Sequence, residues 1–258
     1  MTATKLRAVP VERVWGRRDI PAGFPRLDGD VPIGEIWFEP AADAPLLVKY
    51  LFTAERLSIQ VHPDDAAARA RGFPRGKDEA WYIIDAAPDA RIGIGLTREV
   101  SRETLRAAAL DGSIETLLDW RPVRAGELLY SPAGTIHAIG GGIALIEIQQ
   151  NLDLTYRLYD YGRPRALHLE DGVAVADPRP WTPLPSDGAL LADGGAFRVE
   201  RRRESGRLRE PAVVIPLVAS GTIDGEPLAT GAVWDVKDDA EIAGEGIDLL
   251  IGFPADPA

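Results

Sequence analysis

The chain has 258 residues, of which 45% are hydrophobic, so it can bury a substantial core in one domain or two small ones. Its net charge of −11 and isoelectric point near 4.8 argue against a nucleic-acid partner, which requires a basic surface. It contains no cysteine, which excludes disulfides, thiolate metal ligands and a cysteine nucleophile.

No apolar run approaches the roughly 20 residues that a membrane span needs. Residues 1–16 also lack the apolar core of a secretory signal. We therefore expect a cytoplasmic protein without a membrane partner.

A β-strand is predicted at residues 57–61, because LSIQV is β-prone and the following Pro63 cannot donate to a sheet. Gln60 and His62 are two residues apart, and side chains with this spacing project from the same face of an extended strand. A second β-prone run follows Glu79, whose carboxylate could reach the same place.

Three short helices are predicted in the middle of the chain. Residues 63–72 begin with acidic residues and end at a glycine, residues 101–112 begin at a Ser101 N-cap, and residues 113–120 begin at a Ser113 cap. Elsewhere short strands alternate with Gly and Pro turns, which is typical of an all-β barrel or sandwich.

His137 lies in the most regular segment, SPAGTIHAIGGGIALIEIQQ. Alternation in its second half puts Leu145, Glu147 and Gln149 on one face of a strand. The polar side chains of Glu147 and Gln149 could point into the mouth of a barrel, or could equally face solvent.

Two imidazoles, a carboxylate and an amide oxygen would meet if four residues came together: Gln60, His62, Glu79 and His137. This set suits zinc or another divalent transition metal and leaves room for water or substrate. The alternative is that these are ordinary polar residues with local partners, because no dense motif such as HExxH is present. His168 is predicted to be such an ordinary polar residue.

Several segments together resemble the type I phosphomannose isomerases, zinc-dependent cupins that interconvert mannose 6-phosphate and fructose 6-phosphate. The resemblance runs in order over residues 9–176. Its main motifs are PLLVKYLFTAERLSIQVHPDD (45–65), GKDEAWYIIDA (76–86) and SPAGTIHAIGGGIALIEIQQNLDLTYRLYDYGR (131–163). It implies a mainly β double cupin, built of jelly-roll barrels with a few short helices.

The resemblance also implies how the site is equipped. One Zn²⁺ per chain, or another divalent transition metal, would be held by the four residues that the spacing suggests: Gln60, His62, Glu79 and His137. Lys77 would lie near the substrate, and Asp153 and Arg157 would take part in catalysis. Asp153 or Lys77 would transfer the proton, while Arg157 would stabilise charge.

Phosphate binding needs local positive charge in this acidic protein. Lys77, Arg157 and Arg163 are the candidates. Arg17 and Arg18 replace a glycine-rich pair of the family, and could either touch a phosphate or lie on the surface.

We expect residues 1–178 to form a metal-binding catalytic cupin domain with a helical insert at about 98–119. After a Pro-rich linker, residues 179–258 would form a smaller cupin-like β domain, which lacks histidine and is expected to be structural. The basic run at 198–210 has mixed charges and is predicted to be a solvated edge.

The expected function is therefore a metal-dependent aldose–ketose isomerase, a monomer or homodimer, that acts on a small sugar phosphate through a cis-enediol. The alternatives are a non-catalytic sugar-phosphate-binding cupin and an isomerase of another aldose phosphate. An oxygen-using metal cupin is disfavoured, because a neutral substrate would give no reason for Lys77 and Arg157.

Overall fold

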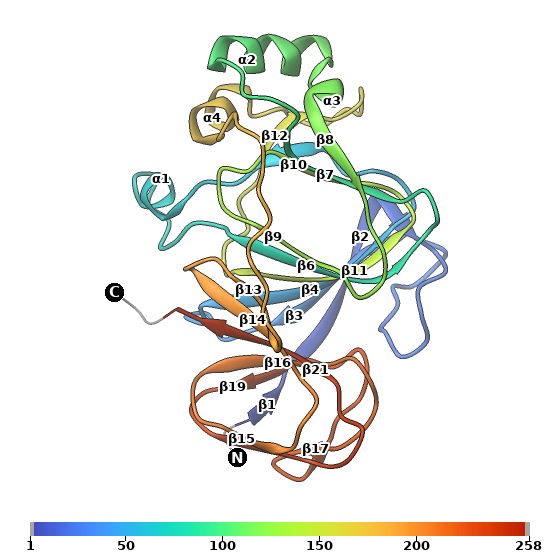
Figure 1. The fold of residues 1–258 in the computed structure, drawn as a ribbon. Coiled ribbons are helices and arrows are strands. Elements are labelled where there is room, and N and C mark those ends of the chain that lie inside the picture. The colour runs from blue at the N-terminus through green and yellow to red at the C-terminus, as the bar shows by residue number, and fades with distance from the viewer. Residues whose placement is uncertain (1–2, 256–258) are drawn as a thin grey trace.

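The structure is a computed structural model and describes residues 3–255 of the chain. Figure 1 shows two β units, one above the other, with the helices placed around the upper unit. The fold is mainly β, as predicted, with few short helices. No helix in the described range is both long and apolar enough to cross a membrane.

The upper unit consists of two antiparallel sheets that face each other. The first contains, in spatial order, β2 (Arg7–Arg17), β3 (Ile33–Glu39), β4 (Leu46–Thr53), β11 (Ile143–Gln150), β6 (Glu79–Ala86) and β9 (Leu128–Ser131). The second contains β12 (Tyr156–Tyr159), β5 (Ile59–Val61), β10 (His137–Ile139), β7 (Arg91–Leu96) and β8 (Leu118–Pro122). Their inner faces enclose a core and, beside it, a polar site.

The lower unit is also made of two sheets. One contains β1 (Ala3–Lys5), β19 (Trp234–Val236), β16 (Ala212–Pro216), β21 (Leu249–Pro254), β14 (Phe197–Arg202) and β13 (Leu190–Asp193). The other contains β15 (Gly206–Leu208), β20 (Ala240–Ala243), β17 (Thr222–Ile223) and β18 (Glu226–Pro227). Strand β1 thus pairs with the C-terminal half, a feature that the predicted division at residue 178 does not include. That division stays a prediction.

The helices largely follow the predicted capping signals. In α2 (Arg102–Asp111), the Ser101 hydroxyl accepts a hydrogen bond from the Thr104 backbone N–H, and Gly112 ends the helix in the left-handed conformation. Helix α1 (Asp65–Arg69) also lies within its predicted segment. Helix α4 (Leu169–Val175) was not predicted.

The helix predicted at 113–120 is too long. Helix α3 (Ile114–Leu117) is a single turn, and Ser113 makes no capping hydrogen bond through its side chain. Leu118 and Trp120 instead belong to β8, where they pair with Leu96 and Gly93 of β7. Strand pairing therefore overrides the local helical pattern.

The side chains on the two faces of strand β11 pack in two different hydrophobic cores. Leu145 packs inside the upper unit, among side chains from both of its sheets. Ile146 and Ile148 lie on the other face, in a core shared with Phe197 and Val213 of the lower unit. The predicted alternation is confirmed, and it leaves Glu147 and Gln149 pointing into the barrel.

Replacing Phe197 by alanine is expected to destabilise the whole protein. The side chain is 1% exposed, and its ring centroid lies 5.0 Å from that of Tyr130 in the core that joins the units. Its loss should lower the free energy of unfolding by about 3–5 kcal/mol, measured by denaturant titration. Val218→Ala, at an exposed side chain, is the control and should change it by less than about 0.5 kcal/mol. Equal effects in the two variants would contradict a shared core.

Candidate metal centre and pocket

Three strands bring the predicted ligands together. Gln60 of β5 and His137 of β10 face each other in antiparallel register, and His62 follows β5 directly. Strand β5 ends at Val61, the predicted end, and Pro63 follows two residues later. Glu79 is the first residue of β6, in the opposite sheet.

The resulting cluster is compact and buried. The ligand atoms of His62, Glu79 and His137 all lie within 4.8 Å of one another, and each residue is at most 2% exposed. Glu79 Oε1 is 3.2 Å from His62 Nε2, and Glu79 Oε2 is 3.4 Å from His137 Nε2. The Gln60 amide is 3.3 Å from His137 Nε2. The four residues predicted from spacing are thus neighbours.

Backbone carbonyls orient both imidazoles. His62 Nδ1 is 2.9 Å from the Leu154 carbonyl oxygen, and His137 Nδ1 is 2.9 Å from that of Thr135. A carbonyl only accepts hydrogen bonds, so each Nδ1 carries the proton and each Nε2 keeps its lone pair. This arrangement fixes the tautomer that binds a metal through Nε2.

The donor atoms fit a divalent transition metal. His62 Nε2 and both carboxylate oxygens of Glu79 are buried and form no properly directed hydrogen bond to any described residue. Such groups are rare in native proteins unless an ion or water binds them. Rotating the Gln60 amide by half a turn would present its oxygen to the cluster, since amide orientation follows the hydrogen-bond network.

At neutral pH, burial and the neighbouring charges favour the protonation states of the two histidines and Glu79 that bind a metal. Burial, reinforced by the Lys77 ammonium, lowers the pKa of His62 to about 4, and burial also lowers the pKa of His137. Burial alone would raise the pKa of Glu79. The Lys77 ammonium, 2.8 Å away, and the two histidines outweigh burial, so this pKa lies well below its usual value. Neutral imidazoles and an ionised carboxylate are the forms that bind metals.

We expect the metal-free protein to lose stability as the pH falls from about 6.5 to about 4. His62 takes up a proton near its ordinary pKa of 6.5 when unfolded, but only near 4 when folded. The unfolded state therefore binds more protons in this window, at a cost of at most about 1.4 kcal/mol per pH unit. Denaturant titrations across the window measure the slope. The variant His62→Gln should have a shallower slope, and an unchanged slope would contradict the assignment.

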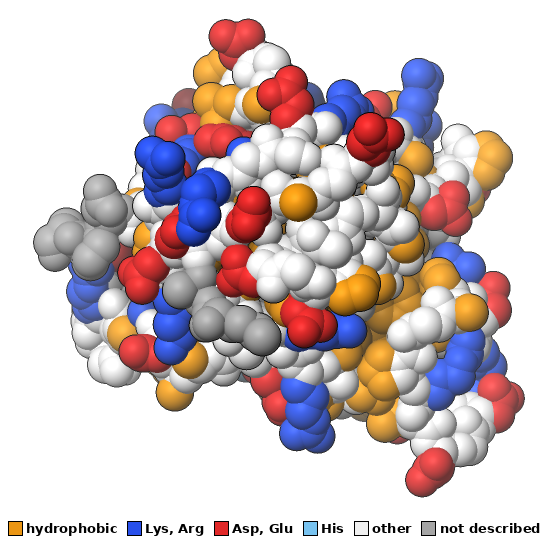
Figure 2. Space-filling model, turned by 90° about the horizontal axis from the view of Figure 1, so that it is seen from below, with side chains coloured by type: hydrophobic (Ala, Val, Ile, Leu, Met, Phe, Trp, Pro, Cys, Tyr) orange, Lys and Arg blue, Asp and Glu red, His pale blue; other side chains and the backbone are white. Residues whose placement is uncertain are grey.

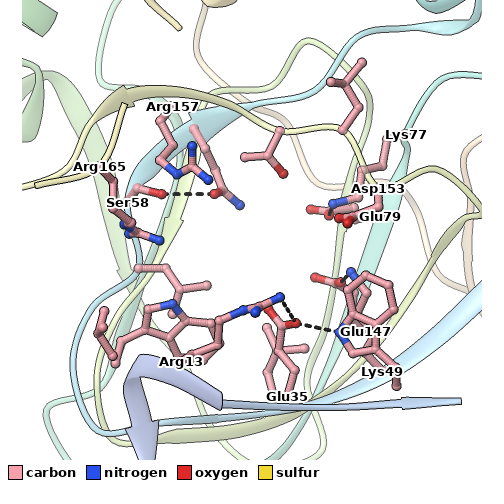
Figure 3. Close-up of a pocket in the computed structure, with 18 of the residues that line it drawn as sticks. Arg13, Glu35, Lys49, Ser58, Lys77, Glu79, Glu147, Asp153, Arg157 and Arg165 are labelled. Atoms are coloured by element: carbon pink, nitrogen blue, oxygen red, sulfur yellow. Dashed lines mark hydrogen bonds and ion pairs between the residues drawn. The ribbon is translucent and has the colours of Figure 1, made fainter. Parts of the chain in front are cut away.

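A cavity of about 580 Å³ opens beside the cluster, a size typical of small-molecule sites. Lys77, Asp153 and Arg157 line it together with Gln60 and Glu79. Figure 3 shows that Lys77, Asp153 and Glu79 lie on one side of this pocket, with Arg157 across from them. The residues that the family resemblance implied therefore meet in one place.

Three other arginines discussed from the sequence lie elsewhere. Arg163 pairs with Asp160 and donates to a backbone carbonyl, and it does not line the pocket. Arg17 and Arg18 form ion pairs with acidic surface residues, which agrees with the surface alternative.

His168 has a local partner, as predicted. Its Nδ1 accepts a hydrogen bond from the Arg157 backbone N–H at 3.2 Å, although the residue also borders the pocket.

Sequence reasoning missed Lys49 in the pocket wall and left open whether Glu147 points inward, as it does here. Lys49 Nζ donates to the Gln149 side-chain oxygen at 2.6 Å and lies 3.3 Å from Glu147, while Trp81 Nε1 donates to Glu147. Burial, reinforced by Glu79, raises the pKa of Glu147. Lys49 is a charged residue within the apolar run LLVKYLF, and that signal could have identified it.

The fold and the buried cluster of two imidazoles and a carboxylate define a cupin with a metal-binding triad. No family model matches the chain. A mannose-6-phosphate isomerase of Streptococcus mutans is 42% identical over 159 residues, 56% of this chain and 50% of that protein. The chain spans about half the length of the curated relatives it matches.

Solved structures extend the likeness over nearly the whole chain. The mannose 6-phosphate isomerase of Bacillus subtilis is 26% identical, with a TM-score of 0.81 over 98% of this chain and 99% of that one. A zinc-bound mannose 6-phosphate isomerase shares the fold at 16% identity, with a TM-score of 0.72 over 99% of this chain and 100% of that one. The chain is thus similar to mannose 6-phosphate isomerases, in sequence over about half of its length and in fold over nearly all of it.

Proposed function

We propose that this protein is a metal-dependent aldose–ketose isomerase that interconverts mannose 6-phosphate and fructose 6-phosphate through a cis-enediol. One observation supports the proposal above all. The buried cluster of His62, Glu79 and His137 opens onto a pocket, and that pocket is lined by Lys77, Asp153 and Arg157. The names of the relatives support the same activity.

We propose zinc as the metal, one ion per chain, held by Gln60, His62, Glu79 and His137. Their nitrogen and oxygen donors suit zinc, and other divalent transition metals remain alternatives. A bound divalent cation would act as a Lewis acid toward the carbonyl and hydroxyl oxygens of the sugar.

Lys77 is suited to donate a proton rather than to remove one. Burial lowers the pKa of Lys77, but Glu79 and Glu147 outweigh it, so the pKa lies above its usual value and the ammonium stays charged. It can therefore hold a developing negative charge on a sugar oxygen.

Asp153 is the proposed base, because it lies on the same side of the pocket and has an exposed carboxylate. Glu147, with its raised pKa, is a second candidate for proton transfer. Arg157 would stabilise the charge of the enediolate.

A coupled assay tests the proposal directly. Protein stripped of metal by a chelator should produce no fructose 6-phosphate from mannose 6-phosphate, and zinc should restore turnover. The alternative of a non-catalytic cupin predicts sugar-phosphate binding without turnover in the zinc-loaded protein. An isomerase of another aldose phosphate would leave mannose 6-phosphate unchanged but would convert a different aldose phosphate to its ketose when zinc is bound.

Three expectations about the cellular setting belong to the proposal. The protein would work in the cytoplasm on a small molecule, without nucleic acid or membrane, and as a monomer or homodimer. Light scattering with size-exclusion chromatography measures the oligomeric state.

A further inference from the structure

Acidic and basic side chains are interspersed on the face of the molecule shown in Figure 2, so charge does not single out a binding surface there. The polar residues that still lack a role lie in the upper unit, next to the metal cluster. They surround Gly76, Lys77 and Asp78, which lead directly into Glu79 at the start of β6. These three residues belong to no strand or helix, so sheet pairing does not fix the backbone of Lys77.

The three backbone N–H groups of this segment each bind an acceptor outside it. The first, of Gly76, donates to Asp65 Oδ1 at 2.7 Å, and the third, of Asp78, donates to Gln150 Oε1 at 3.0 Å. The middle one, of Lys77, donates to a backbone carbonyl oxygen at 3.0 Å. Two of the three acceptors are thus side chains, which a substitution can remove.

The two side-chain acceptors are also bonded to each other. Gln150 Nε2 donates to Asp65 Oδ1 at 3.1 Å, the same oxygen that accepts from Gly76. Gln150 is 9% exposed, and its backbone N–H donates to the Asp78 carbonyl oxygen at 3.1 Å. Burial raises the pKa of Asp65, but the hydrogen bonds from Gly76 and Gln150, helped by two arginines, outweigh burial and lower it. The ionised carboxylate that results is a strong acceptor.

Gly76 allows the segment to lie directly against the loop that follows His62. A Cβ atom at Gly76 would lie 2.5 Å from the Asp64 carbonyl carbon and 2.6 Å from the Asp65 backbone nitrogen, which is closer than side chains approach a backbone. This close approach brings the Gly76 N–H within reach of the Asp65 carboxylate. The segments that carry His62 and Glu79 are therefore joined by contacts outside the pocket.

We propose that Asp65 and Gln150 form a clamp that positions the Lys77 ammonium and the Glu79 carboxylate. Neither Asp65 nor Gln150 lines the pocket, so both act through the segment that they hold and are positioning residues. Lys77 and Glu79 are buried and lie 2.8 Å apart, so a small shift of their backbone changes what they present to a metal and a substrate. The effect on Glu79 as a ligand is independent of the reaction, whereas the effect on Lys77 in catalysis rests on the proposed function.

Asn151 supplies a matched control. It follows Gln150 directly, and its side-chain N–H donates to the Ala44 carbonyl oxygen at 3.0 Å, outside the clamped segment. Asp65→Asn is a second control, because an amide keeps an oxygen that can accept from both partners. The Asp78 carboxylate has two hydrogen-bond partners of its own, so the segment stays attached to the fold when the clamp is removed.

Titration of zinc in competition with a chelating dye tests the clamp without any substrate. The variants Gln150→Leu and Asp65→Ala should each bind zinc at least about tenfold more weakly than the parent, as is usual for residues that support a ligand. The affinities of Asn151→Leu and Asp65→Asn should stay close to that of the parent. Circular dichroism and thermal unfolding establish that each variant is folded. Should Gln150→Leu fail to fold, Gln150→Glu, which sets a carboxylate against Asp65, takes its place. Unchanged zinc affinity in the folded Gln150 and Asp65→Ala variants would overturn the proposal.

A double variant tests whether the two side chains act as one unit. Because they share a hydrogen bond, the loss of zinc affinity in Asp65→Ala/Gln150→Leu should be clearly smaller than the sum of the two single losses in free energy. Losses that simply add would indicate two independent contacts and would overturn the clamp.

Steady-state kinetics separates this inference from the proposed function. At full zinc occupancy, Gln150→Leu should lower kcat for mannose 6-phosphate about tenfold or more with a smaller change in KM, because the misplaced Lys77 is a proposed catalytic group. A parent protein without turnover, whose zinc affinity still depends on Asp65 and Gln150, would leave the clamp standing and sink the isomerase. Parental kcat in the zinc-filled variant would overturn the positioning of Lys77.

Discussion

The variant His137→Ala is expected to lose metal binding and the proposed isomerase activity while keeping its fold. The imidazole is buried and oriented by the Thr135 carbonyl, with Nε2 directed at Glu79. Changing residues that only support a ligand weakens metal binding by about 10–100-fold, so loss of a ligand should exceed this. Metal content after dialysis, measured by atomic emission, gives the result.

The fold should survive because the extensive β cores do not depend on the ion, in contrast to a small zinc-dependent domain. His168→Ala is the control for metal content, since His168 hydrogen-bonds a backbone N–H and lies outside the cluster. Undiminished metal content in His137→Ala would refute the ligand assignment.

The variant Lys77→Met is expected to lower kcat by about 10²–10⁴-fold, the usual range for a lost proton-transfer group. The Lys77 side chain is 4% exposed, and its ammonium lies 2.8 Å from Glu79, at the mouth of the metal cluster. Methionine keeps the length and apolar character of the side chain but carries no proton. If Lys77 acts on the reacting atoms, as proposed, KM should change far less than kcat.

Metal content must be measured in the same sample, because Lys77 also neutralises Glu79. Normal metal content with a low kcat supports a catalytic role. If the variant has a low kcat and has also lost its metal, Lys77 acts by holding Glu79 in position rather than in the reaction itself. Lys237→Met, an exposed lysine in the lower unit, should leave both quantities unchanged.

Local patterns were sufficient for the parts of the site that lie along one strand. The spacing of Gln60 and His62 predicted a shared face, and the structure places both at the cluster. The alternation of residues 143–150 predicted two faces, but not which one pointed inward. That choice depends on the lower unit, whose core covers the apolar face of β11.

Contacts between distant segments could not be predicted in this way. Arg13 reaches the pocket because β2 pairs with β3, and Glu35 of β3 then fixes its guanidinium. Arg163 and Arg165 are two residues apart and share Asp160, so only the path of the loop decides which one borders the pocket. The predicted end of the helix at residue 120 was wrong for a similar reason, because Leu118 pairs with Leu96 of β7 in a sheet.

The most direct test is a titration of zinc into the stripped protein, with bound metal and turnover of mannose 6-phosphate followed in the same samples. The account predicts that turnover rises in proportion to bound zinc and stops rising at one ion per chain. Full turnover without metal, or none with the site filled, would contradict it.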